Sequence, residues 1–482
     1  MILNNTLYGV EIFKSKNEKK IQLGLVKKNL RILIKSMILC LAVLFFIQVS
    51  AQTSIKDDWY TEGDFAPLNR IKITVTNPLN IELKDQPVVV ERSQLPYGNI
   101  PERWVAVVDP NLPENVEPTR EQLKKMSGYF KRKETNGHAV ELQLDDIDKD
   151  GIWDEIFFMT NLGPKETRDF FIYFGHYERG LYPHEVHAAT ANYGRHTVPF
   201  MESKIMGWKL WYPQDLDLHG KRKPMLTAYN EYSTNLSGYY MPWEEGTDIM
   251  WVQKTFGAGG MCIFEDPNDP ENPARAFYSP YKDMGPVKDS RFSYDVIANG
   301  PLRGIVKVST RNWNSGKGFY EMDQYYTVIA NKSYCMVRVN FKKFLPPGSE
   351  SMFGAGIRKI MMEYKSIHKG GTVISMGKNV LARIPDESIG DTALVVPWEG
   401  IAMIVKDKYN PKYVAIKNWD GNHLFQIPQT QNLSYEYMAL GGWSYGEVNN
   451  NEKDFVKYVE TEGLKYNDPP IIKILQYEVK GK

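Results

Sequence analysis

Short segments in which apolar residues dominate or alternate with polar ones recur along most of this chain, and turn residues separate them. Early examples are IKITVTN at 71–77, WVAVVD at 104–109, EIFFM at 155–159 and FFIYF at 170–174. Similar segments follow at 249–256, 304–313, 325–331, 335–344, 394–398, 402–406, 435–440 and 471–479. Runs of this length bounded by Gly, Pro and Asn are typical of β-strands. The pattern therefore predicts an all-β protein with β-sandwich architecture.

Helical periodicity is weak and occurs only around residues 120–126 and 452–461, and no repeat of fixed period stands out. The length of the chain allows two packed β-domains. We expect a small N-terminal β-sandwich over residues 59–180. A larger, supersandwich-like domain over residues 190–480 would carry the active site.

The N-terminal segment has the pattern of an export signal. Residues 1–36 hold eight basic and two acidic side chains, and the apolar run MILCLAVLFFIQVSA follows at 37–51. The run ends in small residues, so we expect a signal peptide over residues 1–51, cleaved before Gln52. It is too short for a stable membrane span. The sequence thus predicts an exported, periplasmic protein with no membrane span.

Charge and cysteine content exclude some classes of partner and scaffold. Removing residues 1–51 would change the formal net charge from +1 to about −5, which argues against nucleic acid as a partner. Only Cys262 and Cys335 then remain, too few for a disulfide framework or a zinc quartet. They would form one bridge or stay as two buried thiols. No motif indicates an organic cofactor.

The stretch DIDKDGIWDE at 146–155 has the spacing of a loop that wraps around a hard cation. Gly151 would make the sharp turn, while Phe157 stands where an EF-hand has its bidentate Glu. The expected ligands are Asp146, Asp148, Asp150, the carbonyl of Ile152, and Asp154. We expect a structural Ca²⁺ here, and an ordinary acidic turn is the alternative.

Residues 193–260 form the densest candidate for chemistry. HGKRKP at 219–224 is a basic tract inside an acidic protein, and such a tract can bind a carboxylate or a sulfate. A solvated surface turn is the other explanation. TFGAGGM at 255–261 allows close approach of the backbone to a sugar, or simply makes a tight turn.

Three stretches within 202–222, 245–260 and 313–341, together with the acidic loop, resemble the family catalogued as domain of unknown function 4861. The resemblance covers most of residues 70–480. It implies a β-sandwich carbohydrate-active protein of the kind found in polysaccharide-degrading marine bacteria. It further implies an oligosaccharide dehydratase or lyase that acts on uronate-containing polysaccharides such as ulvan. Relatives carry a His where this chain has Tyr240, which makes the proton carrier at that position uncertain.

Elimination across C4–C5 of a uronate needs a group that neutralises the carboxylate, a base for the C5 proton and an acid for the leaving oxygen. We assign these roles to Arg222, His196 and Tyr240, with the last two exchangeable. A lone His is more often structural, and His219 and Tyr229 are reserves. The expected substrate-binding residues are Lys221, Lys223, His219, Tyr229, Glu244 and Asp248.

The sequence thus predicts a dehydratase that removes water from a terminal uronic acid of an oligosaccharide. If a sugar leaves instead of water, the enzyme is a polysaccharide lyase. A glycoside hydrolase would need two facing carboxylates, for which Glu202 and Glu244 are candidates. A non-catalytic carbohydrate-binding protein would use exposed Trp residues and the acidic loop.

Overall fold

The structure is a computed structural model that describes most of the chain after residue 69. The described residues are 70–96, 105–112, 140–174, 183–193, 196–211, 214–228, 245–276, 289–383 and 394–475, without the side chains of 70, 191–193, 196–197, 382–383 and 394. The predicted signal peptide and the predicted helix at 120–126 lie outside these residues. Residues 68–482 form one compact unit.

Two small antiparallel sheets form the N-terminal sandwich. One has the order β24-β1-β6-β3, and its strands are Ile471–Leu475, Arg70–Thr76, Thr167–Phe174 and Val105–Val108. The other has the order β2-β5-β4, and its strands are Leu83–Glu91, Glu155–Leu162 and Leu142–Asp145. Alternate residues such as Ile71, Ile73 and Val75 pack into one core between the sheets, as period-two alternation requires.

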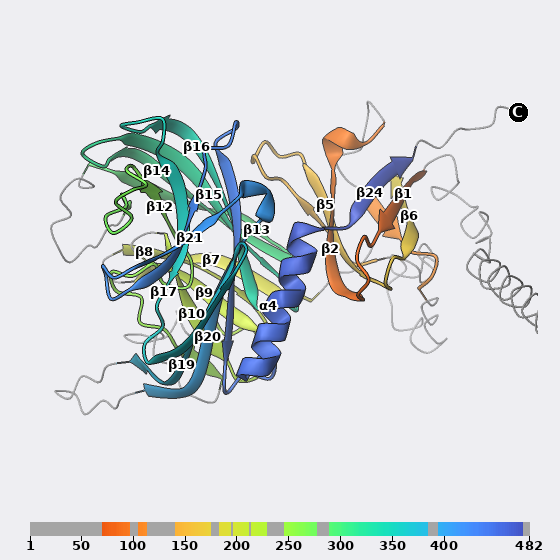
Figure 1. The fold of residues 1–482 in the computed structure, drawn as a ribbon. Coiled ribbons are helices and arrows are strands. Elements are labelled where there is room, and N and C mark those ends of the chain that lie inside the picture. The colour runs from red at the N-terminus through yellow and green to blue at the C-terminus, as the bar shows by residue number, and fades with distance from the viewer. Residues whose placement is uncertain are drawn as a thin grey trace, which may run out of the picture. The chain divides into compact units, whose positions relative to one another are not determined.

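The last strand, β24, joins this sandwich although it is nearly 400 positions away from β1 along the chain. It pairs with β1 from Lys72↔Leu475 to Thr76↔Ile471 (Figure 1). The pattern had assigned this segment to the larger domain, and it carries no local signal for its partner. The division into domains at 59–180 and 190–480 otherwise stays a prediction.

An eight-stranded antiparallel sheet forms the centre of the larger part. Its order is β13-β14-β15-β16-β23-β20-β19-β18. The strands, in that order, are Arg291–Asn299, Arg303–Asn314, Phe319–Ile329, Tyr334–Leu345, Ser434–Trp443, Leu394–Val405, Thr372–Arg383 and Glu363–Lys369. The two predicted segments at 394–398 and 402–406 form the single strand β20, because the intervening residues continue its ladder with β19 and β23.

Two further sheets pack on the eight-stranded one. The five-stranded sheet β11-β10-β9-β8-β7 comprises Gly246–Asp248, Asp215–Lys221, Met206–Trp211, His196–Ser203 and Val186–Tyr193. The sheet β12-β17-β22-β21 comprises Gly260–Phe264, Met352–Arg358, Asn422–Ile427 and Lys412–Ile416. Side chains of all three sheets share one core, which includes Trp208, Tyr326 and Phe353. The prediction of an all-β sandwich is confirmed.

One α-helix, α4, covers part of the eight-stranded sheet beside the N-terminal sandwich (Figure 1). It spans Glu452–Asn467, six residues beyond the predicted end, and Asn451 caps it by accepting a hydrogen bond from the N–H of Asp454 at 3.1 Å. Two 3₁₀ turns, η3 at Arg92–Gln94 and η8 at Asp407–Tyr409, lie between strands. Among the described residues, no helix is long and apolar enough to cross a membrane.

The strand predicted at 249–256 does not form. The N–H of Ile249 donates to Leu218 O at 3.0 Å, but the N–H of Met250 donates to the Asp248 side chain, and the carbonyl of Trp251 accepts from Arg358. Side chains therefore take the bonds that a strand ladder would use. The glycine-rich segment after it is a tight turn, in which Gly257 has φ +56° and packs on the backbone of Leu216. Cys262 and Cys335 are both buried free thiols.

Replacing Gly220 with alanine tests how closely β10 packs on the eight-stranded sheet. A Cβ at Gly220 would lie within 2.8 Å of three atoms of the Trp443 indole. Because buried rings cannot move without disturbing their neighbours, we expect Gly220→Ala to lower the free energy of unfolding by about 1–3 kcal/mol. In Gly463→Ala on α4 the nearest atom is 3.6 Å away, so this control should not destabilise. Urea unfolding measures the free energy of unfolding of both variants. Equal values for Gly220→Ala and Gly463→Ala would contradict the packing described.

Candidate functional site

Strand β10 carries charged and apolar residues in strict alternation, yet both of its faces are buried. Asp215, Asp217, His219 and Lys221 point to one side, and Leu216, Leu218 and Gly220 to the other. A strand with this pattern ordinarily turns its charges to water. Here every residue of β10 is buried, and Asp217 is 0% exposed. Burying so many charges is costly unless each one is paired, so the partners of these side chains matter.

Lys209 on the neighbouring strand β9 is the centre of the pairing. Its Nζ lies 2.9 Å from Asp217 Oδ2, 3.2 Å from Asp248 Oδ2 and 3.3 Å from His219 Nε2. The strand register brings these groups together, because Asp217 stands opposite Lys209 and His219 stands opposite Asp248. An ammonium group has three N–H donors, and these three acceptors match them.

Asp217 is held by a second set of bonds. Its Oδ2 also accepts from the indole N–H of Trp211 at 2.7 Å, and its Oδ1 accepts from the backbone N–H of Leu218. Burial, and after it the nearby charge of Asp248, raise the pKa of Asp217 to about 6 against the opposing effects of Lys209 and His219. Its neighbour on the strand, Asp215, forms a 2.7 Å ion pair with Arg275.

Two groups from the other sheets act on these carboxylates. Glu399 of β20 is 0% exposed, and neither of its oxygens has a hydrogen-bond partner in the part of the chain that the structure describes. Burial raises the pKa of Glu399 well above its usual value; Arg358 opposes this, and Asp248 and Asp217 add to it. Glu399 is thus a buried carboxyl group whose surroundings favour the protonated form.

Arg358 at the end of β17 is buried without a carboxylate partner. Its guanidinium donates to the backbone carbonyls of Lys359, at 3.1 Å, and of Trp251. It has no ion pair within 4.0 Å among the described residues. Burial lowers the pKa of Arg358, and the charges of Glu399, Asp420 and Asp217 raise it. Trp251, whose backbone carbonyl accepts from Arg358, is itself partly exposed.

We refer to these residues together as the charged site: Lys209, Asp217, His219, Asp248, Arg358 and Glu399. Two features distinguish it from an ordinary structural ion pair. The pKa values of two of its carboxyl groups, Asp217 and Glu399, are raised by different environments, and one of its cations, Arg358, lacks a counter-ion. Displaced pKa values that differ within one cluster are typical of acid–base sites.

The structure brings two predicted site residues, His219 and Asp248, together in the charged site. Lys221 lies on the same face of β10, but its ammonium is buried in an ion pair with Glu202 and also donates to Met225 O. Lys223 is exposed. The Lys221–Glu202 pair also receives the backbone N–H groups of Thr227 and Ala228, so it organises the chain after β10.

Arg222 lies away from the carboxylates and against aromatic rings. Its guanidinium carbon is 4.3 Å from the ring centroid of Tyr445 and 6.0 Å from that of Trp443. Its backbone N–H donates to Glu245 O at 3.0 Å, which joins β10 to the residue before β11. An Arg on an aromatic face can still present N–H donors to an anion. Its predicted role in neutralising a carboxylate stays a prediction.

The remaining predicted residues cannot be placed. His196 begins β8, where its backbone pairs with Tyr193, but its side chain lies outside the described residues. Tyr229, Tyr240 and Glu244 also lie outside them. The pairing of Glu202 with Glu244 as hydrolase carboxylates is therefore untested, although Glu202 is already bonded to Lys221.

Sequence reasoning missed four members of the charged site. Asp217 had a usable signal, since the alternation DLDLHGK at 215–221 places it on one face with His219. Lys209 had a weaker one, as the charged residue within the apolar stretch WKLW at 208–211. Glu399 and Arg358 had none. They come from β20 and β17, far along the chain, and only the packing of three sheets brings them to β10.

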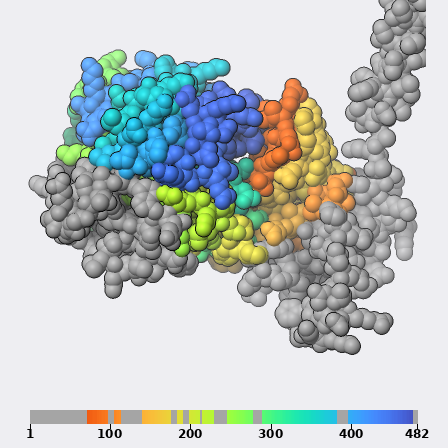
Figure 2. Space-filling view, turned by 90° about the horizontal axis from the view of Figure 1, so that it is seen from below, coloured from red at the N-terminus to blue at the C-terminus, as the bar shows by residue number. Residues whose placement is uncertain are grey.

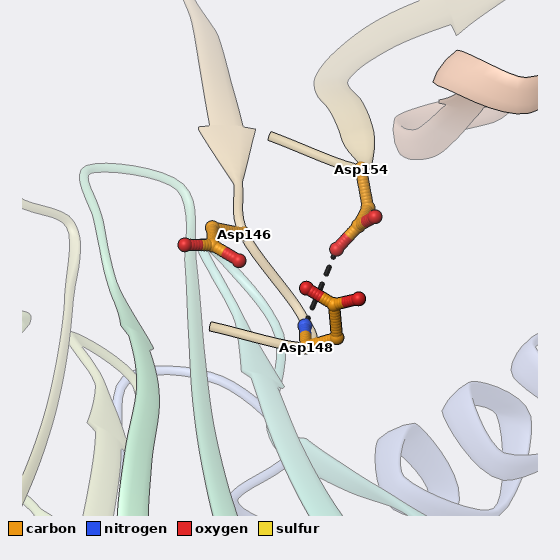
Figure 3. Close-up of side chains that lie close together, drawn as sticks. All are labelled: Asp146, Asp148 and Asp154. Carbon is orange, nitrogen blue, oxygen red and sulfur yellow. Dashed lines mark hydrogen bonds between the residues drawn. The ribbon is translucent and has the colours of Figure 1, made fainter. Parts of the chain in front are cut away.

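The acidic loop joins β4 to β5, and part of the predicted oxygen cage converges there. Asp146, Asp148 and Asp154 each offer a carboxylate oxygen within 4.8 Å of the others (Figure 3). The Oδ1 of Asp150 instead accepts the N–H of Ile152 at 2.8 Å. The same carboxylates also accept N–H groups of the loop, as Asp146 does from Gly151 at 2.9 Å. Oxygen donors of this kind suit Ca²⁺, and the calcium prediction stays a prediction.

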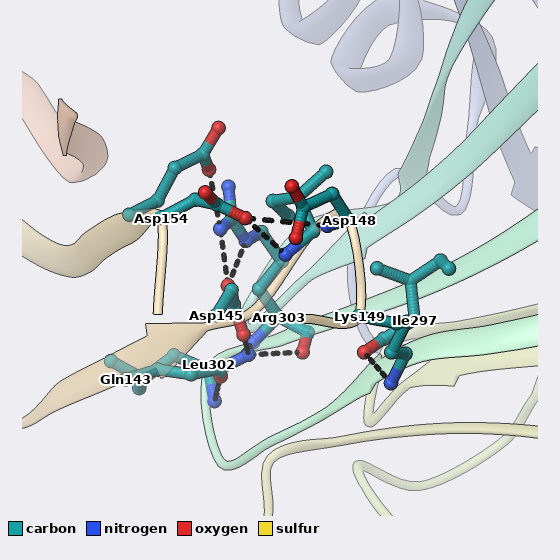
Figure 4. Close-up of polar contacts among 10 residues, drawn as sticks. Gln143, Asp145, Asp148, Lys149, Asp154, Ile297, Leu302 and Arg303 are labelled. Atoms are coloured by element: carbon teal, nitrogen blue, oxygen red, sulfur yellow. Dashed lines mark hydrogen bonds and ion pairs between the residues drawn. The ribbon is translucent and has the colours of Figure 1, made fainter. Parts of the chain in front are cut away.

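The same hairpin is attached to the eight-stranded sheet. Arg303 of β14 donates to Asp145 Oδ2 at 2.7 Å and to Glu155 Oε2 at 2.7 Å (Figure 4). Gln143 accepts the N–H groups of Leu302 and Arg303, and Lys149 Nζ donates to Ile297 O at 2.8 Å. The loop thus lies where the N-terminal sandwich meets β13 and β14. A cation there would stabilise this junction.

Comparison with known proteins gives a family match and distant structural likenesses. The model of the family described as Domain of unknown function (DUF4861) matches residues 75–472. No curated protein sequence matches. Among solved structures, an alpha-mannosidase from Enterococcus faecalis V583 is similar, with a TM-score of 0.43 and 10% identity over 85% of this chain and 46% of that one. A protein in the glycosyl hydrolase family 38 from Enterococcus faecalis is also similar, with a TM-score of 0.44 and 10% identity over 85% of this chain and 48% of that one. This chain spans about half the length of each.

Calcium titration of the acidic loop tests the cation prediction. If Ca²⁺ binds the folded chain only, a concentration one hundred times the Kd raises the free energy of unfolding by about 2.7 kcal/mol. We expect Ca²⁺ to raise the melting temperature, EDTA to reverse the rise, and Asp146→Asn to abolish it. Asp169→Asn, a surface carboxylate bonded to Lys72, is the matched control and should keep the response. If neither Ca²⁺ nor EDTA changes the melting temperature, the loop is an ordinary acidic turn and not a calcium site.

Proposed function

The chain belongs to the family described as Domain of unknown function (DUF4861), and from this premise we propose that it is a carbohydrate-active enzyme that eliminates water from a terminal uronic acid. The product is a 4,5-unsaturated uronate. In the reaction a base takes the proton at C5, the electron pair forms the C4–C5 double bond, and the oxygen at C4 leaves with a proton from an acid. The charged site offers a group for each of these needs.

The buried guanidinium of Arg358 is the observation that carries the proposal. A cation withdrawn from water without a counter-ion is costly, and a substrate carboxylate would supply the missing partner. Pairing with a guanidinium also makes the C5 proton of a uronate easier to remove, because the charge that develops on the carboxylate is stabilised. A neutral sugar would leave Arg358 uncompensated, so this feature favours acidic sugars.

Glu399 is the proposed acid. Its raised pKa keeps a proton on the carboxyl group at a pH where an exposed Glu has lost it, and no described group accepts that proton in the absence of substrate. Proton donation to the C4 oxygen would turn a poor leaving group into water. Glu399 is then consumed as an acid in each turnover and recovers its proton from solvent or from the base.

His219 is the proposed base, and Lys209 is a positioning residue. The Lys209 ammonium donates to His219 Nε2, which fixes the ring relative to Asp217 and Asp248. Proton transfer from C5 to His219 Nε2 would replace the hydrogen bond from Lys209, and the two carboxylates would then stabilise the new imidazolium. His196, Tyr240 and Arg222 remain predicted participants from the sequence, and export to the periplasm remains part of the proposal.

A glycoside hydrolase is the second candidate, and the charged site supplies the reason. It holds three carboxyl groups whose environments differ, which is also the requirement for an acid and a nucleophile or base on a glycosidic bond. The unpaired Arg358 distinguishes the two, since a hydrolase of neutral sugars has no need of it. A polysaccharide lyase differs from the dehydratase only in the group that leaves C4.

Incubation of the mature chain with ulvan oligosaccharides separates these reactions. Ultraviolet absorbance reports the unsaturated uronate, and mass spectrometry reports the leaving group. We expect rising absorbance together with products lighter by one water. Rising absorbance with chain cleavage would make the enzyme a lyase. New reducing ends without absorbance would favour the hydrolase, and binding without any product would leave a carbohydrate-binding protein.

Glu399→Gln tests the assigned acid. We expect its kcat to fall by about a hundredfold or more, since general acid catalysis contributes roughly that much. Because burial raises the pKa of Glu399, the wild-type rate should fall as pH rises through that pKa, and the variant should lack this limb. Glu460→Gln, on the exposed side of α4, is the control and should keep the wild-type profile. An unchanged pH profile in Glu399→Gln would exclude Glu399 as the acid.

A further inference from the structure

A cavity lies on the other side of the eight-stranded sheet from its shared core. Its volume is about 400 Å³, within the range of small-molecule sites. Strands β15, β16 and β23 form its floor, α4 forms one wall, and β2 with the start of β24 forms another. Figure 1 shows α4 and β2 flanking the sheet there, and Figure 2 shows the C-terminal residues (blue) meeting the N-terminal strands (orange and yellow).

The walls combine apolar, aromatic and charged groups. Met336 and Met438 lie on the floor, Pro87 and Pro469 on the sides, and Tyr325 and Tyr466 line the space as well. Methionine adapts to irregular apolar surfaces, proline adds rigid apolar surface, and tyrosine rings pack against the C–H faces of sugar rings. Such a lining suits a ligand with an apolar body and polar edges.

The charges that line the cavity are paired with one exception. Glu155 is bonded to Arg303 at 2.7 Å. Glu436 is bonded to Lys406 at 2.6 Å, and Glu462 to Lys465 at 2.9 Å. Each acidic group on the wall therefore already has a cation within hydrogen-bond distance.

Arg338 is the exception. Its guanidinium carbon lies 4.7 Å from the ring centroid of Tyr325, and it has no ion pair in the described ranges. Its Nε is buried and has no hydrogen-bond partner there. Its charge lowers the pKa of Glu436, but Lys406 is the larger cause and takes the hydrogen bond. A buried N–H without an acceptor is costly, and a ligand oxygen would remove that cost.

We propose that this cavity is a second saccharide site, separate from the charged site, which takes one sugar ring bearing a carboxylate. Arg338 binds the carboxylate through its planar fork, and the tyrosines and methionines contact the ring. The anionic group follows from Arg338 alone. The choice of a sugar as the body of the ligand rests on the proposed function. A site of this kind would hold an acidic polysaccharide on the enzyme while another residue of the chain is processed.

Calorimetric titration of the full mature chain with sodium glucuronate tests the site. The titration uses an Arg358→Gln background, which removes the one cation of the charged site that has no counter-ion and so isolates the cavity. We expect glucuronate to bind, glucose not to bind, and Arg338→Gln to weaken the glucuronate affinity by about tenfold or more. Arg291→Gln, on the same sheet and outside the cavity, is the matched control and should bind as the background does.

Three results would overturn the proposal. Equal affinity in the Arg338 and Arg291 variants, or no glucuronate binding in the Arg358→Gln background, would exclude the cavity as the site. If acetate binds as tightly as glucuronate, the site does not recognise the sugar ring.

Thermal unfolding should give equal melting temperatures for Arg338→Gln and Arg291→Gln, because Arg338 has no ion pair to lose. Arg338→Lys, for which we expect an intermediate affinity, serves as a second test. Arg338-dependent binding without any unsaturated product would refute the proposed reaction but not the cavity.

Discussion

A single buried ammonium group, that of Lys209, sets the conditions for the candidate site. It is 1% exposed and has three acceptors, two carboxylates and an imidazole, from β10 and β11. Losing the ammonium would leave two buried carboxylates, Asp217 and Asp248, without their cation, which costs several kcal/mol. The five-stranded sheet can bury a charged face only because this network is complete. The other face of the same sheet is apolar and packs into the shared core.

Burial on both faces explains why three sheets are needed. β10 has an apolar side that meets the eight-stranded sheet, where Trp443 packs on Gly220, and a charged side that must be shielded from the core. The irregular segment after β11 crosses between them, and its bonds go to Asp248 and Arg358 rather than to a strand. The same departure from regular structure that ended the predicted strand also positions Arg358. Local irregularity and candidate chemistry thus coincide, as expected where function competes with regular pairing.

The sequence predicts the architecture better than the site, and the reason is the range of the interactions. Alternation of apolar residues over a few positions is enough to predict strands such as β1, β5 and β16, and the helix at 452 has a local cap and periodicity. The pairing of β24 with β1 and the approach of Glu399 to Asp217 depend on contacts between distant segments, for which a single sequence holds no signal. His219 and Asp248 were found because both lie in the segment 193–260, which its composition singles out. The sequence held no signal that Lys221 would be buried and bonded to Glu202, and its role in binding a substrate stays a prediction.

The protonation state of Glu399 tests the central claim most directly, because an acid can serve the reaction only if it holds its proton in the resting enzyme. Infrared difference spectroscopy of the wild-type chain against Glu399→Gln at neutral pH would measure it. The account predicts a carboxylic acid C=O band in the wild type that is lost in the variant. If the wild type instead shows a carboxylate band in its place, Glu399 is ionised, and the charged site is an ion-pair network that stabilises the fold without supplying an acid.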